Sequence, residues 1–317
     1  MFPKASQLQP AAKAHAPNVI HVNAKASGAS NGHAGDAATS CKVEDVLEEV
    51  IHPSDLARSV HIWALGVVCV LGGHLYGWNA AFATGFVPYA VSQVITGAAF
   101  VVYMSSAAEV SGKIAFSGGS YGLTRITLGF YAGFLVGFLE ALEYIASAAV
   151  SVSYVADFIC SEFDIDDAYQ PLMWFIFYAV FIGIFQLRGK YVWNFMVVFA
   201  LACIAPSVLF VVTNMHRADL PRYGGIVDNT TGSVVWASGT LSSAYFAWLP
   251  YTSWGYAGVE CLTLVTSMTT DPKDTIPRGM LSSTWTLFIS NVSLIFMVAS
   301  LPPGMNDAID DEFPLNN

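Results

Sequence analysis

The chain has 317 residues, a mean hydropathy of +0.53 and a formal net charge of −10. Hydrophobic residues make up 55% of it and charged residues 11%, about half the charged share of an ordinary globular domain. This composition excludes a typical soluble domain and indicates a membrane protein, and the acidic balance provides no basic patch for nucleic acid.

The N-terminal segment differs from the rest of the chain. Residues 1–41 are rich in Ala, Ser, Gly, Asn and His, with scattered lysines and no long apolar run. They predict a disordered tail without a signal-peptide pattern. Residues 43–60 carry apolar side chains at helical spacing, which suits either a helix along the inner membrane face or a solvated helix. We therefore divide the chain into a tail (1–59), a transmembrane domain (60–304) and an acidic end (305–317).

Long apolar runs follow the tail. A bilayer core about 30 Å thick needs roughly 20 mostly apolar residues per helical span. Runs of suitable length predict seven spans, numbered 1 to 7 in chain order: 61–84, 86–108, 130–159, 172–187, 191–213, 241–266 and 280–301.

Basic residues predict the orientation of these spans, since short loops rich in Lys and Arg stay in the cytoplasm. Such residues lie in the loops after spans 2, 4 and 6, whereas the loop after span 3 is acidic. We therefore expect a cytoplasmic N-terminus and insertion in the plasma membrane.

Glycines interrupt spans 1 and 6. Span 1 contains "LGGHLYGWN" and span 6 contains "WGYAGVE". Interrupted helices in corresponding positions of two repeats commonly form a transporter's binding site, and these two spans are five apart, as an inverted repeat of five helices requires. The alternative is that the glycines only permit close helix packing.

Two carboxylates, Glu140 and Glu143, lie within apolar span 3. Residues three apart share a helix face, so both are expected to point into one site. Because a charge at membrane depth is costly, such residues usually mark a pathway or relay. They could hold an amine or carry a proton; the alternative is a structural pair that contacts another helix.

The five cysteines, by contrast, show neither close pairs nor metal-ligand spacing along the sequence, so we expect structural thiols and no metal site. Nor does the sequence contain a nucleophile elbow or a nucleotide-binding loop, and we expect neither an enzyme nor a bound cofactor.

Two motifs resemble a known family. "FSGGSYGLTRITLG" (116–129) is similar to the segment that opens span 3 in permeases of the amino acid-polyamine-organocation (APC) superfamily, and "WGYAGVECLTLVTSMTTDPKDTIPRGM" (254–280) is similar to their sixth span and following loop. "SGGSYG", "GFLEALEYI" and "DPKDTIPR" most resemble ethanolamine permease-like members. The resemblance covers about residues 60–304.

The resemblance implies an all-α membrane protein with a LeuT-type inverted-repeat fold and broken helices 1 and 6. It implies carriage of amino acids or small organic amines, among them ethanolamine and polyamines, in symport with protons, by alternating access. About 7 of 12 transmembrane helices are present, so the chain resembles a truncated permease. A non-transporting accessory membrane protein is the alternative; a seven-helix receptor is disfavoured because its N-terminus would lie outside.

Site residues follow from the same resemblance. Substrate binding is implied for the two broken segments, at Gly77, Trp78, Asn79, Trp254, Gly255, Ala257 and Gly258. Glu260 matches a carboxylate linked to proton coupling, and Tyr121 resembles an inner-gate tyrosine. The expected partners are an amine or amino acid, a proton and the lipid bilayer.

Overall fold

The computed structural model describes residues 55–71, 78–114, 118–227, 232–238 and 240–310. The predicted tail lies outside these residues except for 55–59, as do residues 72–77 of span 1 and 311–317 of the acidic end. The described chain is almost entirely helical, with one short antiparallel ribbon, β1 (Ile226–Val227) paired with β2 (Val234–Val235).

Five helices among the described residues are long and apolar enough to cross a membrane, which confirms spans 2, 3, 4, 5 and 7. They are α3 (Phe86–Lys113), α5 (Phe130–Glu162), α6 (Gln170–Phe185, preceded by the 3₁₀ turn η4, Asp167–Tyr169), α7 (Gly189–Asn214) and α10 (Pro272–Ala299). The last begins eight residues before the predicted start of span 7. Its first turns are polar, so the apolar run marks only its inner part, and Pro272 suits the first turn of a helix.

Spans 1 and 6 are not continuous α-helices. Span 1 consists of α2 (Ser59–Leu71) and, after the undescribed residues 72–77, the 3₁₀ helix η3 (Asn79–Thr84). Span 6 consists of α9 (Leu241–Trp254), a turn, and the 3₁₀ helices η6 (Val259–Thr263) and η7 (Thr266–Met268). The expected interruption of span 6 is therefore present. The glycine-rich part of span 1 lies outside the described residues.

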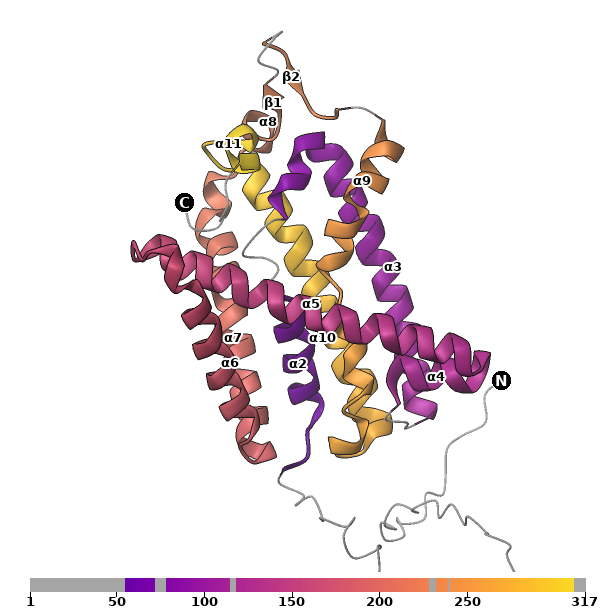
Figure 1. Ribbon diagram of the computed structural model, residues 1–317. Helices are drawn as coiled ribbons and strands as arrows, with labels where there is room; N and C mark the ends of the chain where they lie inside the picture. Colours follow the sequence, from indigo (N-terminus) through magenta and orange to yellow (C-terminus); the bar gives the residue numbers. More distant parts are fainter. Residues whose placement is uncertain (1–54, 72–77, 115–117, 228–231, 239, 311–317) are drawn as a thin grey trace, which may run out of the picture. The chain divides into compact units, whose positions relative to one another are not determined.

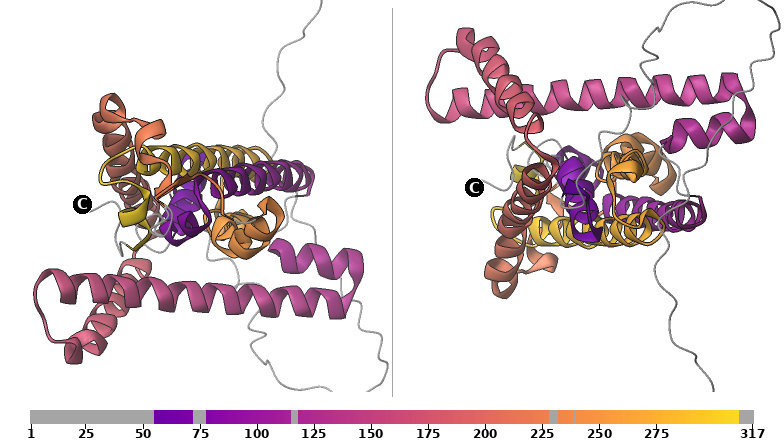
Figure 2. Two further views of the ribbon diagram at one scale, coloured as in Figure 1. Left: turned by 90° about the horizontal axis from the view of Figure 1, so that it is seen from above. Right: turned by 90° about the horizontal axis from the view of Figure 1, so that it is seen from below.

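Spans 1 and 6 pack among continuous helices. Helix α10 packs against both α2 and α3, while α2 also contacts α7 and α3 contacts α9 (Figures 1 and 2). One apolar cluster joins α2, α3, α7, η6 and α10, and includes the fully buried Val67, Leu262 and Leu287. The broken helices are thus held in the centre by long helices that bury their apolar faces.

Helices α4 (Gly119–Leu128) and α5 form a hairpin. Gly129 between them has φ +95°, a conformation that L side chains rarely adopt. A Cβ on Gly133 would lie 2.7 Å from Cβ of Arg125, so this glycine allows the two helices to approach closely. In this way residues 118–122 of the "SGGSYG" motif are folded back against the span that carries the two carboxylates.

The residues before α2 tie the first span to two distant segments. Arg188, at the start of α7, forms an ion pair with Asp55 at 3.0 Å, and Trp193 Nε1 donates to the carbonyl of Asp55 at 3.1 Å. The amide of Ala57 donates to the carbonyl of Met268 at 2.7 Å, and the amide of Thr270 returns a bond to the carbonyl of Ala57 at 2.9 Å. This segment therefore fastens the start of α2 to α7 and to the end of span 6.

The predicted cytoplasmic basic residues gather at one end of the helices. In Figure 1 the start of α2, the end of α3, the junction of α6 and α7 and the start of α10 lie together at the bottom. The β-ribbon, α8 (Leu220–Tyr223) and α11 (Met305–Asp310) lie at the other end. This arrangement agrees with the prediction that the basic loops lie together at one end; which end faces the cytoplasm stays a prediction.

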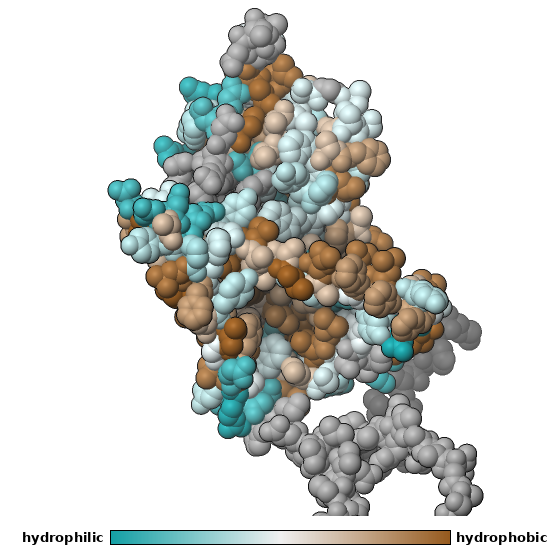
Figure 3. Space-filling view, viewed as in Figure 1, coloured by the Kyte–Doolittle hydropathy of each residue, from teal (hydrophilic) through white to brown (hydrophobic). Residues whose placement is uncertain are grey.

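Apolar side chains cover much of the outer surface. The most apolar stretches of α5 and of the η4–α6 segment contain no buried residues, as suits helices whose side chains contact lipid. Figure 3 shows hydrophobic residues concentrated across the middle of one face, with hydrophilic residues more frequent toward both ends. The surface supports the assignment of an integral membrane protein.

Candidate functional site

Helix α9 stops at Trp254, and the chain turns before η6 begins. The amides of Tyr256 and Ala257 both donate to the carbonyl of Ser253, at 3.0 and 3.1 Å, which closes the last turn of α9. On α10, Asn291 Nδ2 donates to the carbonyl of Gly255 at 2.9 Å. A side-chain amide thus satisfies a carbonyl that the interruption removes from the helical hydrogen-bond pattern.

Glu260 lies immediately beyond the turn. Gly258 has φ +104°, and its amide donates to both carboxylate oxygens of Glu260 at 3.0 Å. An amide donor at this position can stabilise the ionised carboxylate, and the left-handed backbone that aims it there is one that glycine adopts readily. The two glycines of "WGYAGVE" therefore have different roles: one lies against Asn291, and the other orients a donor.

Buried hydroxyl and amide groups attach the interrupted span to α3. Thr96 and Thr252 lie 3.2 Å apart through their Oγ1 atoms, and Gln93 Nε2 donates to the hydroxyl of Tyr256 at 3.4 Å. All four residues are between 0% and 4% exposed. Because unsatisfied polar groups in a membrane are costly, these pairs fix the position of α9 and of the turn.

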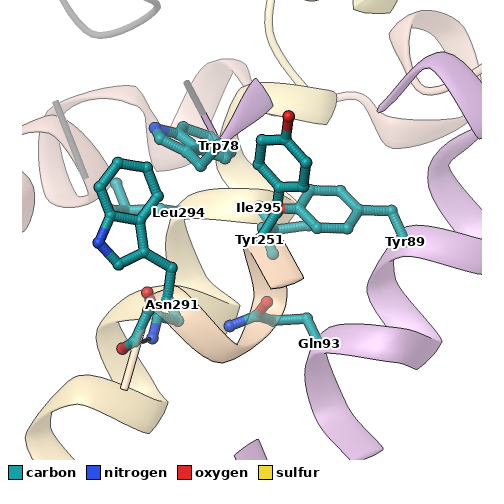
Figure 4. Close-up of a pocket in the computed structure, with 9 residues that line it drawn as sticks. Trp78, Tyr89, Gln93, Tyr251, Asn291, Leu294 and Ile295 are labelled. Atoms are coloured by element: carbon teal, nitrogen blue, oxygen red, sulfur yellow. Dashed lines mark hydrogen bonds between the residues drawn. The ribbon is translucent and has the colours of Figure 1, made fainter. Parts of the chain in front are cut away.

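A first cavity lies beside the interruption, and we call it the tryptophan cavity. About 390 Å³ of empty space, part of it open to solvent, is lined by Trp78, Tyr89, Gln93, Tyr251, Trp254, Gly255, Asn291, Leu294 and Ile295. Figure 4 shows Gln93 and Asn291 on one side of this cavity and Trp78 on the opposite side. It therefore combines aromatic faces with two side-chain amides.

A second cavity, the carboxylate cavity, is more open. It is lined by Phe100, Tyr103, Ser120, Val136, Leu139, Glu140, Glu143, Ala257 and Glu260. The two carboxylates of span 3 therefore face one space, and Glu260 of span 6 faces the same space. Within the described chain, no group of three or more His, Cys, Asp or Glu is arranged to hold a metal ion.

Three other predicted site residues lie elsewhere. Gly77 is outside the described residues. Asn79 is 2% exposed and donates from Nδ2 to the carbonyl of Ala308 in α11 at 2.7 Å, so this bond ties η3 to α11. Tyr121 lines neither cavity; its hydroxyl accepts a 2.7 Å hydrogen bond from Arg125 Nη1, and its ring packs where a Cβ on Gly137 would lie.

Sequence reasoning missed several cavity residues. Gln93 and Asn291 line the tryptophan cavity, as do Tyr89 and Tyr251, and Tyr103 lines the carboxylate cavity. The available signal was an amide side chain inside each of two apolar spans. In a membrane such groups need a hydrogen-bond partner, so each marks a contact with another helix.

Continuous apolar helices packed around an interrupted span 6 define the class of this protein: an all-α membrane protein with a transporter-type fold. A family model described as amino acid permease matches residues 60–312, and the chain belongs to this family. The match spans both cavities.

One curated relative adds to this assignment. The chain is 25% identical over 251 residues to a protein of Rhizobium meliloti (strain 1021) described as an uncharacterized transporter. The aligned region covers 77% of this chain and 52% of the relative, so the chain spans about half the length of the curated relative that it matches.

Proposed function

We propose that the protein is a secondary active carrier of amino acids or small organic amines, coupled to protons and working by alternating access in the plasma membrane. The single observation that carries this proposal is the position of Glu260. It follows the interruption of span 6 directly, accepts two hydrogen bonds from the Gly258 amide, and lines a cavity together with Glu140 and Glu143.

Substrate recognition is assigned to the interrupted spans. Trp78 and Trp254 offer aromatic faces to an ammonium group, and such faces attract cations most strongly when water is excluded. Gly77 and Asn79 are proposed to contribute from the broken part of span 1, and Gly255, Ala257 and Gly258 from that of span 6. We also propose Tyr121 as a gate residue.

Proton coupling is assigned to the carboxylate cavity. Glu260 changes the charge of this space when it gains or loses a proton, and the Gly258 amide provides a partner for its ionised form. Glu140 and Glu143 lie on the opposite helix and complete the negative lining. An ammonium group or a proton can therefore compensate the same charge, which is the elementary requirement for coupling the two.

The test is uptake into proteoliposomes under an imposed pH gradient, with a panel of amino acids, ethanolamine and diamines. We expect Glu260→Gln to abolish pH-dependent accumulation while the protein keeps its thermal unfolding temperature. Glu109→Gln is the matched control, because Glu109 is exposed on α3, pairs with Lys113 and lines neither cavity.

Two outcomes would count against the proposal. Unchanged pH dependence in Glu260→Gln would remove the coupling role of this residue. A folded protein that takes up none of these compounds and that none of them stabilises would favour a non-transporting, permease-like accessory protein.

A further inference from the structure

Two cysteines that are 192 residues apart in the sequence lie side by side in the structure. Cys69 belongs to α2, two residues before its end, and Cys261 belongs to η6. Their sulfur atoms are 3.9 Å apart, close enough for a weak S–H···S hydrogen bond. Spacing along the sequence gave no sign of this pair, because the contact is made between spans 1 and 6.

The separation of the sulfurs allows a covalent bond to form with a small movement. A disulfide has an S–S length of about 2.05 Å, so the two sulfurs must approach by about 1.9 Å. Rotation about the Cα–Cβ bonds can supply most of this. The backbones are also close, since a Cβ built on Gly258 would lie 3.4 Å from Cβ of Cys69.

One of the two thiols lies next to the interruption of span 6. Cys261 belongs to a 3₁₀ helix that follows the turn of this span. A 3₁₀ helix has poorer hydrogen-bond geometry than a continuous α-helix, so this segment can adjust to a crosslink at lower cost.

A small oxidant can reach the pair. The Cys69 side chain is exposed and that of Cys261 is half-buried. The residue next to Cys261, Glu260, lines the open carboxylate cavity. In contrast, Cys160 is buried near the end of α5, and Cys203 lies on α7.

We propose that Cys69 and Cys261 form a redox-responsive dithiol that a peroxide converts reversibly into a disulfide between the two interrupted spans. Cys69, the more exposed thiol, attacks the peroxide; its sulfur is oxidised to a sulfenic acid and one water leaves. The sulfur of Cys261 then attacks that sulfur, the S–S bond forms, and the hydroxyl departs as a second water. Two thiols and one hydrogen peroxide thus give one disulfide and two waters.

The crosslink has a consequence for transport, which rests on the function proposed above. The disulfide would join α2 to η6, the 3₁₀ helix that contains Glu260. The Glu260 carboxylate could then no longer move independently of span 1. We therefore expect the oxidised protein to carry its substrate more slowly, and dithiothreitol to restore the rate by thiol–disulfide exchange.

The linkage is tested on the membrane-embedded protein. Hydrogen peroxide is added, free thiols are blocked by alkylation, and digested peptides are analysed by mass spectrometry. We expect one peptide pair joined through Cys69 and Cys261, which disappears after dithiothreitol. Cys203→Ser is the matched control and keeps the linkage. In Cys261→Ser, Cys69 is left as a sulfenic acid that dimedone traps; the native protein gives little of this adduct.

The outcomes separate the two proposals. Recovery of Cys69 and Cys261 as unlinked thiols or as sulfinic acids under these conditions overturns the dithiol. If the linkage forms, peroxide should lower uptake at least fivefold in the native protein and leave Cys69→Ser unaffected; an unchanged native rate overturns the consequence for transport. If the reduced protein takes up no compound, the proposed function fails, whereas the linkage assay still decides the dithiol.

Discussion

Asn291 on α10 donates its side-chain amide to the carbonyl of Gly255 at 2.9 Å, across the interruption of span 6. A Cβ on Gly255 would lie 2.9 Å from that nitrogen. The absence of a side chain at Gly255 therefore leaves the space that the Asn291 amide occupies. Asn291 is 6% exposed. Asn291 is therefore one of the side chains of continuous helices that stabilise the broken span from outside.

Removing this amide should destabilise the protein. Asn291→Ala leaves a buried carbonyl without its donor, which costs about 1–3 kcal/mol. Asn214→Ala is the control, because Asn214 also donates its amide to a backbone carbonyl, that of Phe210 at 3.0 Å, but within its own helix. Thermal unfolding in lipid nanodiscs measures both. Equal losses of stability would mean that the bond across the interruption has no special role.

The left-handed glycine gives a second prediction. Gly258→Ala places a Cβ on a residue with φ +104°, and this should destabilise the fold by about 1–2 kcal/mol. It should also misplace the amide that contacts Glu260. Gly183→Ala in α6 is the opposite case: a Cβ there meets nothing within 4 Å, and alanine favours a helix over glycine by up to about 1 kcal/mol. Denaturation should show a lower free energy of unfolding for Gly258→Ala and a higher one for Gly183→Ala.

The carboxylates of span 3 give a prediction about binding. If Glu140 and Glu143 help to hold an ammonium group, Glu140→Gln and Glu143→Gln should each raise the KM for an amine substrate about tenfold, equivalent to about 1.4 kcal/mol. Tyr144 donates its hydroxyl to Glu140 at 3.0 Å, so Tyr144→Phe should have a smaller effect in the same direction. Concentration-dependent uptake measures these values. A change confined to kcat would argue that the pair acts in proton movement rather than in binding.

The segment before α2 can be tested by a double-mutant cycle on Asp55 and Arg188. The Arg188 side chain is 66% exposed, so the ion pair itself should contribute only about 0.2–1 kcal/mol. Asp55 also accepts the Lys190 amide at 3.3 Å and its side chain is 14% exposed, so Asp55→Ala should cost more than Arg188→Ala. The Thr270 amide donates to Ala57 in this segment, so its hydrogen should exchange faster with solvent in Asp55→Ala. An equal cost for the two substitutions would contradict this interpretation.

Much of the fold could be predicted from the sequence. The apolar runs of spans 2, 3, 4, 5 and 7 correspond to helices of matching position, because run length reflects the thickness of the hydrocarbon layer. The glycines of "WGYAGVE" marked the interruption of span 6. The start of α10 was missed by eight residues, since its first turns are polar and carry no hydropathy signal.

Less of the site could be predicted. Helical spacing placed Glu140 and Glu143 on one face, and both do line one cavity. It gave no indication that Glu260 lines the same cavity or that Gln93 and Asn291 border the other. For Asn79 and Tyr121 the resemblance implied site roles, whereas the structure places the first against α11 and the second against α5.

The sequence by itself determined that this is a multi-span membrane protein, where five of its helices cross and where span 6 breaks. Those features depend on local hydropathy and on backbone freedom, which residue order encodes directly. Only the tertiary structure decided which polar groups meet: Asn291 with Gly255, Glu260 with the carboxylates of span 3, and Cys69 with Cys261. Such contacts depend on the rotation and register of one helix against another, which a single helix's periodicity leaves open.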